Sequence, residues 1–204
     1  MSAELEQDLE IRVAEPGHAA GLSALFASNG FGCFCRYWHF EGTSRDWLAR
    51  CAQRPEENRD EMLAALAAGS PEMRGMVALR AGDLVGWLKL APASTLSKLY
   101  GQRLYKDLPC FSGERSSIFC VACLLVREDQ RHHGVARALL AGALAQAPAW
   151  GASAIEAFPR SDPGLADVSL MLGPTQLFLD AGFELVNDFY PYPVLRRRLG
   201  AAQP

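Results

Sequence analysis

The segment SIFCVACLLV at residues 117–126 and the segment REDQRHHGVA that follows it at residues 127–136 decide the fold. The first is nearly all apolar and β-prone, which is typical of a central strand that is covered on both faces. The second is polar, and after it apolar residues recur at helical spacing until Pro148 and Gly151 end the pattern. These residues predict a strand, a tight turn and a helix in immediate succession.

The turn at residues 131–136 has the chemistry of an anion-binding site. The first N–H groups of a helix have no acceptor within the helix, and the helix dipole places partial positive charge there. Gly134 allows a ligand to approach the backbone closely, and Ala136 keeps a neighbouring position small. Arg131, His132 and His133 add donors of suitable charge. The turn is therefore predicted to bind phosphate groups.

Two other phosphate-binding motifs do not fit these residues. A Walker A loop needs glycines that bracket four residues and are followed by Lys and Ser or Thr, and a dinucleotide fingerprint needs three glycines. Residues 127–136 contain Gly134 alone.

On either side of this motif, the pattern predicts further strands and helices. Strands are expected at residues 10–14, 154–158, 183–189 and 194–199, and a hairpin at 75–80 and 84–90 around a turn at 81–83. Helices are expected at residues 20–28, 44–53, 57–68, 95–101 and 168–181, while residues 33–40 form a loop.

The stretch RHHGVA at residues 131–136 resembles the Arg/Gln-x-x-Gly-x-Gly/Ala signature of the GNAT superfamily of acetyl-CoA-dependent N-acetyltransferases. In that signature, as here with Val126, the preceding strand ends just before the turn. The stretch LFLDAGF at residues 177–183 resembles the superfamily's second, helix-to-strand signature. Both lie in the expected order, and the resemblance covers residues 74–199.

The resemblance implies one α/β (α+β) domain over residues 1–204, with flexible termini at 1–8 and 200–204. Its sheet would be mixed and mostly antiparallel, with about six or seven strands and helices on both faces. Acetyl-CoA would be the acyl donor, and a primary amine of a small molecule or peptide would attack its thioester directly in a ternary complex. The implied cofactor-binding residues are Leu124, Leu125, Val126, Arg131, His132, His133, Gly134, Val135 and Ala136.

The catalytic acid and base are less clear from the sequence. Many superfamily members carry a tyrosine, suggested to protonate the departing sulfur, where this chain has Phe178. Phenylalanine has no proton to donate, and helix packing is the simpler interpretation. Glu156 is a candidate base if its strand points it into a partly apolar cleft, and Asp162 is a weaker candidate. The alternative for Glu156 is an exposed or ion-paired carboxylate.

The aromatic-rich segment CFCRYWHF at residues 33–40 is unusual for a loop. Because this region often helps to form the acceptor site in GNAT-like chains, Cys35, Trp38 and His39 are candidate acceptor-binding residues, together with Trp87 from the hairpin. Packing under the sheet explains the same residues nearly as well.

The cysteines Cys33, Cys35, Cys120 and Cys123 have the spacing of a four-thiolate zinc site. Side chains alternate along a strand, so Cys120 and Cys123 are expected on opposite faces of the sheet, where they cannot share an ion. Buried free thiols and no metal are the prediction, with a redox role for Cys33 or Cys35 left open.

The composition and charge of the chain disfavour several classes of function. The chain has 204 residues and a formal net charge of -3, which disfavours nucleic acid as a partner. Its apolar runs are shorter than the roughly 18 residues that cross a bilayer, and the acidic N-terminus has no signal-peptide pattern. A cytoplasmic monomer or homodimer is expected. The rival hypotheses are a non-catalytic acyl-CoA-binding module and a thiol-based redox or metal protein.

Overall fold

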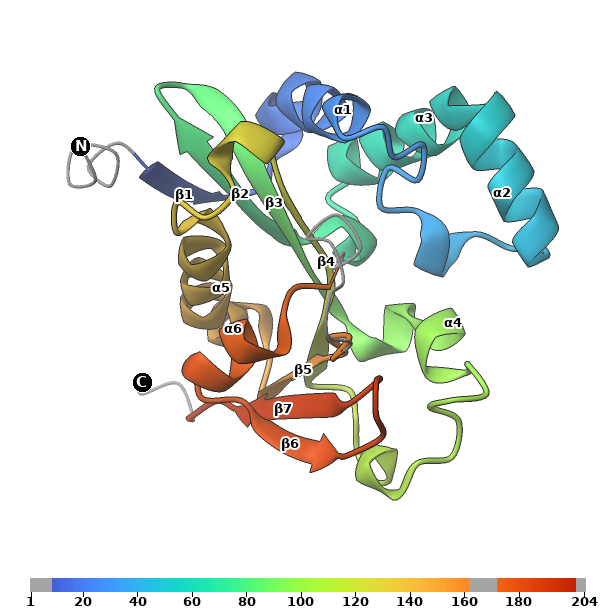
Figure 1. Ribbon diagram of the computed structural model, residues 1–204, viewed down its shortest axis with the longest axis vertical. Coiled ribbons are helices and arrows are strands. Elements are labelled where there is room, and N and C mark those ends of the chain that lie inside the picture. Colours follow the sequence, from blue (N-terminus) through green and yellow to red (C-terminus); the bar gives the residue numbers. More distant parts are fainter. Residues whose placement is uncertain (1–8, 162–171, 201–204) are drawn as a thin grey trace.

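The computed structural model describes residues 9–161 and 172–200, which form one sheet with helices on both faces (Figure 1). The sheet has seven strands in the order β1-β2-β3-β4-β5-β7-β6. The pairing of β4 with β5 is parallel and all the other pairings are antiparallel. The predicted mixed, mostly antiparallel sheet is therefore confirmed.

The strands lie close to their predicted positions. They are β1 (Leu9–Val13), β2 (Gly75–Arg80), β3 (Asp83–Pro92), β4 (Ile118–Val126), β5 (Ala154–Ala157), β6 (Glu184–Asn187) and β7 (Val194–Arg198). The α-helices are α1 (Ala19–Ser28), α2 (Ser44–Gln53), α3 (Pro55–Ala67), α4 (Ser97–Tyr100), α5 (Val135–Gln146) and α6 (Thr175–Asp180).

Helix α6 is shorter than the helix predicted at residues 168–181. It begins at Thr175, directly after Pro174, whose extended backbone starts the helix. Residues 168–171 lie outside the described part of the chain, as do Asp162 and, of the termini that were expected to be flexible, residues 1–8 and 201–204. The prediction was wrong for residues 172–174, because proline is well suited to a helix start and breaks a helix interior.

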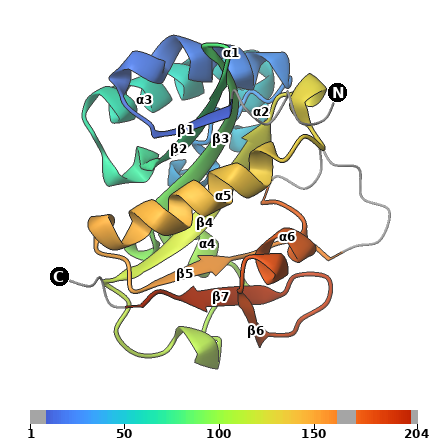
Figure 2. The same cartoon turned by 90° about the vertical axis from the view of Figure 1, so that its left-hand side faces the viewer.

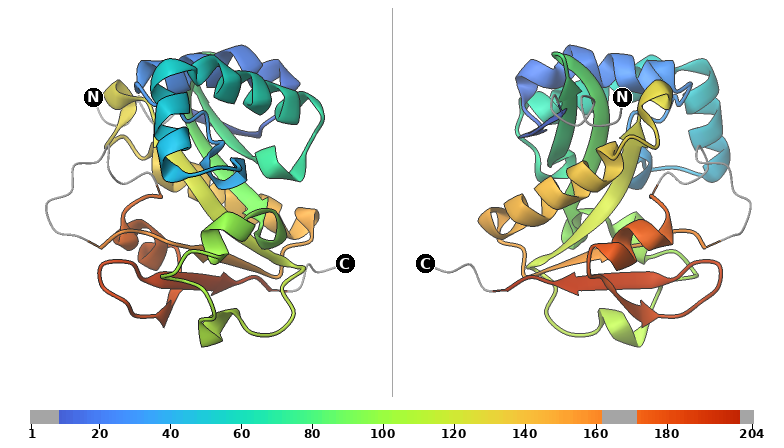
Figure 3. Two further views of the ribbon diagram at one scale, coloured as in Figure 1. Left: turned by 90° about the vertical axis from the view of Figure 1, so that its right-hand side faces the viewer. Right: turned by 60° about the vertical axis from the view of Figure 1, so that its left-hand side comes forward.

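The helices cover the two faces of the sheet in two groups. Helices α5 and α6 lie on one face, where α5 crosses the strands diagonally (Figure 2). Helices α1, α2, α3 and α4 lie on the other face (Figure 3). Under α5, a core of apolar side chains includes Leu88, Leu124 and Leu139, and under α1 and α3 a second core includes Leu22, Met62 and Trp87. The sheet is therefore buried on both sides, as the apolar sequence of β4 predicts.

Strand β4 contains a β-bulge in its middle. Lys89 of β3 pairs with Cys123, but the next residue, Leu90, pairs with Val121, so Ala122 is the extra residue. The bulge breaks the alternation of side chains, and Cys123 and Cys120 consequently lie on the same face of the sheet. The prediction that they point to opposite faces was wrong, since it assumed a regular strand.

Candidate cofactor and acceptor site

The gap between β4 and β5 is the first element of the site. The two strands pair only from Ile118 to Val121 on the β4 side, whereas β4 continues to Val126. Beyond the bulge, therefore, one backbone edge of β4 is not paired with β5. Such an edge offers N–H and C=O groups to an extended ligand.

The turn after β4 brings the start of α5 to the same gap. Gly134 caps the helix with a φ of 79°, in the left-handed region that glycine adopts without strain, and a Cβ there would meet no protein atom within 4 Å. The N–H of Ala138 donates to the carbonyl of Gly134 at 3.0 Å. The N–H groups before it in the first turn have no acceptor within the helix, which leaves them for an anion.

A pocket of about 450 Å³ opens at this corner, within the usual range for small-molecule sites. Seven of the predicted cofactor residues line it: Leu124, Val126, Arg131, His132, Gly134, Val135 and Ala136. Leu125 and His133 are not among the lining residues, and Leu125 packs against the core on the opposite face.

The opposite wall of the pocket was not predicted. It consists of Gly173, Pro174, Gln176, Leu177 and Asp180, at the start of α6 and along it. The sequence places Leu177 and Asp180 in the second GNAT-like signature, but it does not show which side of α6 faces the turn. Gln130 and Arg137 complete the lining beside the turn.

Arg131 braces the turn as well as lining the pocket. One guanidinium nitrogen donates to Oδ1 of Asn29 at 3.0 Å, and Nε lies 3.4 Å from the carbonyl of Val126. The side chain thus ties the end of α1 to the end of β4 and to the turn. The sequence predicted a charged donor here, but not the contact with Asn29.

Phe178 is part of the core. Its side chain is fully buried and meets Phe183 edge to face, with ring centroids 5.3 Å apart. This is the packing role that the sequence favoured for the position.

Glu156 is completely buried and surrounded by donors. Arg115 contacts both of its carboxylate oxygens at 3.1 and 2.8 Å, Arg196 donates to Oε1 at 2.6 Å, and the hydroxyl of Tyr100 donates to Oε2 at 2.6 Å. This geometry matches the ion-paired alternative weighed for Glu156. The role of Glu156 as a base stays a prediction.

The aromatic segment reaches the gap between β4 and β5 through Trp38. Its indole N–H donates to the carbonyl of Ala122, the bulged residue of β4, at 3.1 Å. On the far side of the segment, Nζ of Lys98 lies 4.3 Å from the ring centroid of Tyr37 and donates to the carbonyl of Phe40 at 3.1 Å. The segment is thereby held against both β4 and α4.

Cys35 and Trp87 lie behind this surface, in the core. The indole N–H of Trp87 donates to the sulfur of Cys35 at 3.5 Å, and the Trp87 side chain is fully buried. Burial opposes ionisation of Cys35, but a hydrogen bond from Cys123 and the charge of Lys89 outweigh it and lower the Cys35 pKa to about 6. Of the four predicted acceptor residues, Cys35 and Trp87 thus belong to the core, whereas Trp38 contacts β4 beyond its pairing with β5.

The sequence analysis missed Lys89, a fully buried lysine on β3. Its Nζ contacts Nε2 of His39 at 2.7 Å and the carbonyl of Cys35 at 3.2 Å. The only signal in the sequence is a lysine inside the apolar strand GWLKLAP at residues 86–92.

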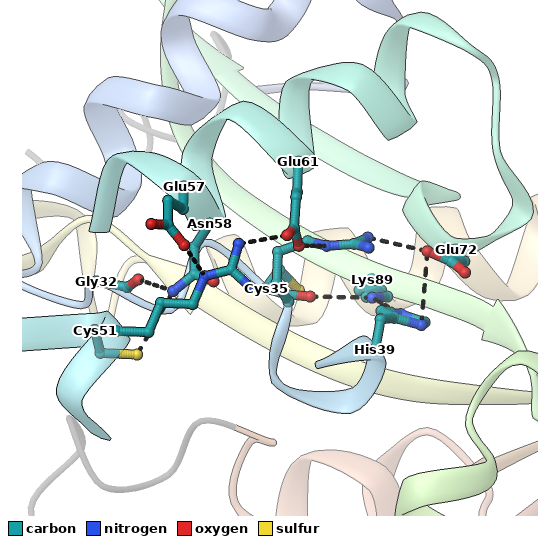
Figure 4. Close-up of polar contacts among 11 residues, drawn as sticks. Gly32, Cys35, His39, Cys51, Glu57, Asn58, Glu61, Glu72 and Lys89 are labelled. Carbon is teal, nitrogen blue, oxygen red and sulfur yellow. Dashed lines mark hydrogen bonds and ion pairs between the residues drawn. The ribbon is translucent and has the colours of Figure 1, made fainter. Parts of the chain in front are cut away.

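Ion pairs fix the segment at residues 33–40 to α3 and to the turn before β2 (Figure 4). Arg36 contacts Glu61 at 3.4 Å and Glu72 at 3.0 Å, and Nδ1 of His39 lies 3.7 Å from the same Glu72 oxygen. Near the start of the segment, the buried Asn58 donates to the carbonyl of Gly32 at 2.7 Å. The segment is therefore fixed in place on the face of the sheet that α1 and α3 cover.

Within residues 9–161 and 172–200, no three His, Cys, Asp or Glu side chains come together in a way that suits a metal ion. The same part of the chain contains no helix with the length and apolar character that a membrane crossing requires.

Comparisons with known proteins agree with this geometry. The profile of the family described as "Acetyltransferase (GNAT) family" matches residues 42–170. No curated protein sequence matches the chain.

Several solved structures share the fold at low sequence identity. A GNAT-family acetyltransferase from Streptococcus pneumoniae is 16% identical, with a TM-score of 0.56 over 95% of this chain and 100% of the other. The GNAT-family N-acetyltransferase YhbS from Escherichia coli, solved with CoA, is 19% identical, with a TM-score of 0.53 over 95% and 82%. Diaminobutyrate acetyltransferase EctA from Paenibacillus lautus, solved with L-2,4-diaminobutyric acid and CoA, is 15% identical, with a TM-score of 0.53 over 94% and 95%.

Proposed function

The chain belongs to the GNAT family of acetyltransferases, which use acetyl-CoA, and from this premise we propose that it acetylates a primary amine of a small molecule or peptide. In this proposal, the neutral amine attacks the thioester directly while both substrates are bound. The observation that carries it is the pocket that joins the start of α5 to the unpaired edge of β4.

The residues of the pocket suit the parts of acetyl-CoA. The N–H groups of the first turn of α5 bind the pyrophosphate, with Gly134 allowing close approach. The pantetheine arm lies along the edge of β4 that β5 leaves unpaired, near Leu124 and Val126. Backbone N–H groups at this edge polarise the thioester carbonyl and stabilise the oxyanion that forms during attack. The CoA complexes of the Escherichia coli and Paenibacillus lautus proteins support a CoA site in this fold.

Catalysis then depends mainly on positioning. Holding the amine against the thioester converts a bimolecular reaction into an intramolecular one, which is a large source of rate enhancement. Phe178 offers no proton to the departing thiolate, so this chain does not use a phenol at that position.

A second candidate function is a non-catalytic acyl-CoA-binding module, which Phe178 favours. Thiol release from acetyl-CoA, measured across a broad panel of amines, separates the two. Sustained turnover with any amine supports the enzyme, whereas binding without turnover supports the module.

Replacing Gly134 by Glu tests the cofactor site. The substitution places bulk and negative charge where the pyrophosphate binds, so calorimetry should show loss of acetyl-CoA binding. Gly151→Glu is the matched control, because Gly151 also has a left-handed backbone, with φ of 88° and nothing within 4 Å of a Cβ, but lies outside the pocket. Undiminished affinity in Gly134→Glu would contradict the proposal.

A further inference from the structure

The cofactor turn, which we define as residues 127–134 between β4 and α5, contains strained backbone. His132 has a φ of 61°, in the left-handed region that residues other than glycine rarely adopt, and Gly134 has a φ of 79°. Backbone in this region keeps its conformation only where surrounding contacts hold it. The N–H groups that are proposed to bind the pyrophosphate follow directly, so their direction depends on those contacts.

One set of contacts comes from the hairpin of β2 and β3, which the cofactor turn meets (Figure 1). Arg80, the last residue of β2, donates from Nη1 to Oε1 of Gln130 in the turn. Gln130 in turn lines the pocket that is proposed to hold acetyl-CoA. The hairpin is a rigid support, because it closes through two left-handed residues, Ala81 and Gly82, with φ of 50° and 86°.

The other end of the Gln130 side chain is also held. Its Nε2 donates to Oδ2 of Asp129 at 3.1 Å, and Asp129 accepts from Nε and Nη2 of Arg127 at 2.7 and 3.1 Å. The backbone N–H of Arg127 donates to the carbonyl of Val85 on β3 at 2.9 Å. This chain of contacts starts on β2 and ends on β3, so it fixes the first half of the turn, residues 127–130, to the hairpin at two points.

The placement of Arg80 does not favour stability. Its Nε is buried and has no hydrogen-bond partner in the part of the chain that the structure describes. A buried donor without an acceptor destabilises the folded state. Within the same residues, the hydrogen bond that the Arg80 guanidinium does make goes to Gln130. The position of this arginine therefore benefits the cofactor turn more than the fold.

We propose that Arg80 is a positioning residue for acetyl-CoA: it holds Gln130 and thereby directs the N–H groups at the start of α5 toward the pyrophosphate. The proposal rests on the proposed function. Arg80 does not line the pocket and acts through Gln130, so its role concerns binding of the pyrophosphate and not the chemistry of the thioester. Arg131, which contacts Asn29 at the end of α1, holds the second half of the turn from the other side.

The alternative is that Arg80 only stabilises the hairpin. Two ligands separate the alternatives, because acetylpantetheine has the thioester and the pantetheine arm of acetyl-CoA but no pyrophosphate. A turn that is no longer held in position weakens binding of acetyl-CoA alone. A purely structural contact changes the free energy of unfolding and affects the two ligands equally.

The experiment measures the affinity of both ligands by ligand-observed NMR, which detects weak binding, and stability by urea unfolding. Arg80→Met removes the donors and keeps a long side chain, and we expect it to bind acetyl-CoA about tenfold more weakly, the scale of one hydrogen bond to a charged group. Its affinity for acetylpantetheine should not change. Gln130→Met breaks the same contact from the other side and should match it, whereas Arg80→Lys keeps a charged donor and should recover part of the loss.

Arg12→Met is the matched control. Arg12 lies on the neighbouring strand β1, and its exposed side chain contacts Glu10, away from the pocket. This variant should bind both ligands as the wild-type protein does.

Three outcomes overturn the inference. If Arg80→Met and Gln130→Met bind acetyl-CoA as tightly as the wild-type protein, Arg80 has no positioning role although the cofactor site is real. If both variants lose affinity for the two ligands equally, the contact is only structural. If the wild-type protein does not bind acetyl-CoA, the proposed function fails and the inference fails with it. Should Arg80→Met not fold, Gln130→Met, at a partly exposed position, decides the question by the same comparison of ligands.

Discussion

The indole N–H of Trp38 donates to the carbonyl of Ala122 at 3.1 Å and so connects the aromatic segment to the bulge of β4. The bulge leaves this carbonyl available as an acceptor, because no residue of β3 pairs with Ala122. One hydrogen bond thus joins the segment at residues 33–40 to the strand on which the thioester is proposed to lie. Substitutions at Trp38 are therefore expected to disturb this segment and the nearby part of β4, and to leave the pyrophosphate site at the start of α5 unchanged.

Trp38→Phe keeps an aromatic ring, although one smaller than the indole, and removes the hydrogen bond. We expect the free energy of unfolding to fall by about 1 kcal/mol, since a partly buried carbonyl loses its partner. We also expect kcat to fall while acetyl-CoA affinity is retained, because the pyrophosphate site is untouched. Urea unfolding and calorimetry check this. Tyr37→Phe, which alters the neighbouring ring at 4.7 Å, is the control, and equal effects in both variants would argue against a specific role for Trp38.

Glu156→Gln should destabilise the protein as a whole. It leaves Arg115 and Arg196 without their shared buried carboxylate, and removing one partner of a buried pair typically costs about 3–5 kcal/mol. Thermal unfolding measures the effect. Glu10→Gln is the control, because Glu10 forms an exposed ion pair, for which the loss should be about 0–1 kcal/mol. A stable Glu156→Gln protein that lacks only turnover would instead restore Glu156 as the base.

His39 should make the protein sensitive to acid. Its pKa in the fold is lowered from 6.5 to about 3, so the folded state binds a proton less readily than the unfolded state. The stability that this contributes is complete above pH 6.5 and is lost as the pH falls toward 3, by at most about 1.4 kcal/mol per pH unit. Urea unfolding at several pH values should show a shallower acid slope in His39→Gln. An identical slope in both proteins would contradict the shifted pKa.

Gly142→Ala should destabilise the contact between α5 and β1, although alanine ordinarily favours a helix by about 1 kcal/mol. A Cβ at Gly142 would lie 2.5 Å from Cγ2 of Ile11. The clash predicts a lower melting temperature, and Ile11→Ala in the same chain should relieve part of it. A higher melting temperature in Gly142→Ala than in the wild-type protein would show that β1 shifts to accommodate the added methyl group without loss of stability.

Much of the fold could be predicted from local sequence patterns. The strand at residues 117–126 was predicted from a continuous apolar run, and the helix after Gly134 from a 3.6-residue apolar period. Both signals are carried by residues that are close together in the sequence. The turn that is proposed to bind phosphate could be located for the same reason, since Arg131, Gly134 and Ala136 lie within one short stretch. The helix at residues 168–181 was predicted too long, because apolar spacing was given more weight than Pro174.

The sequence by itself therefore determined the strand–turn–helix unit, the family resemblance and the corner at which acetyl-CoA is proposed to bind. Only the tertiary structure decided which distant side chains meet there. Lys89 meets His39 across 50 positions, Trp38 meets Ala122 across 84, and Arg131 meets Asn29 across 102. These contacts depend on sheet register and on one bulged residue. A single extra residue reverses which face each later side chain occupies, and no local pattern in the sequence records it.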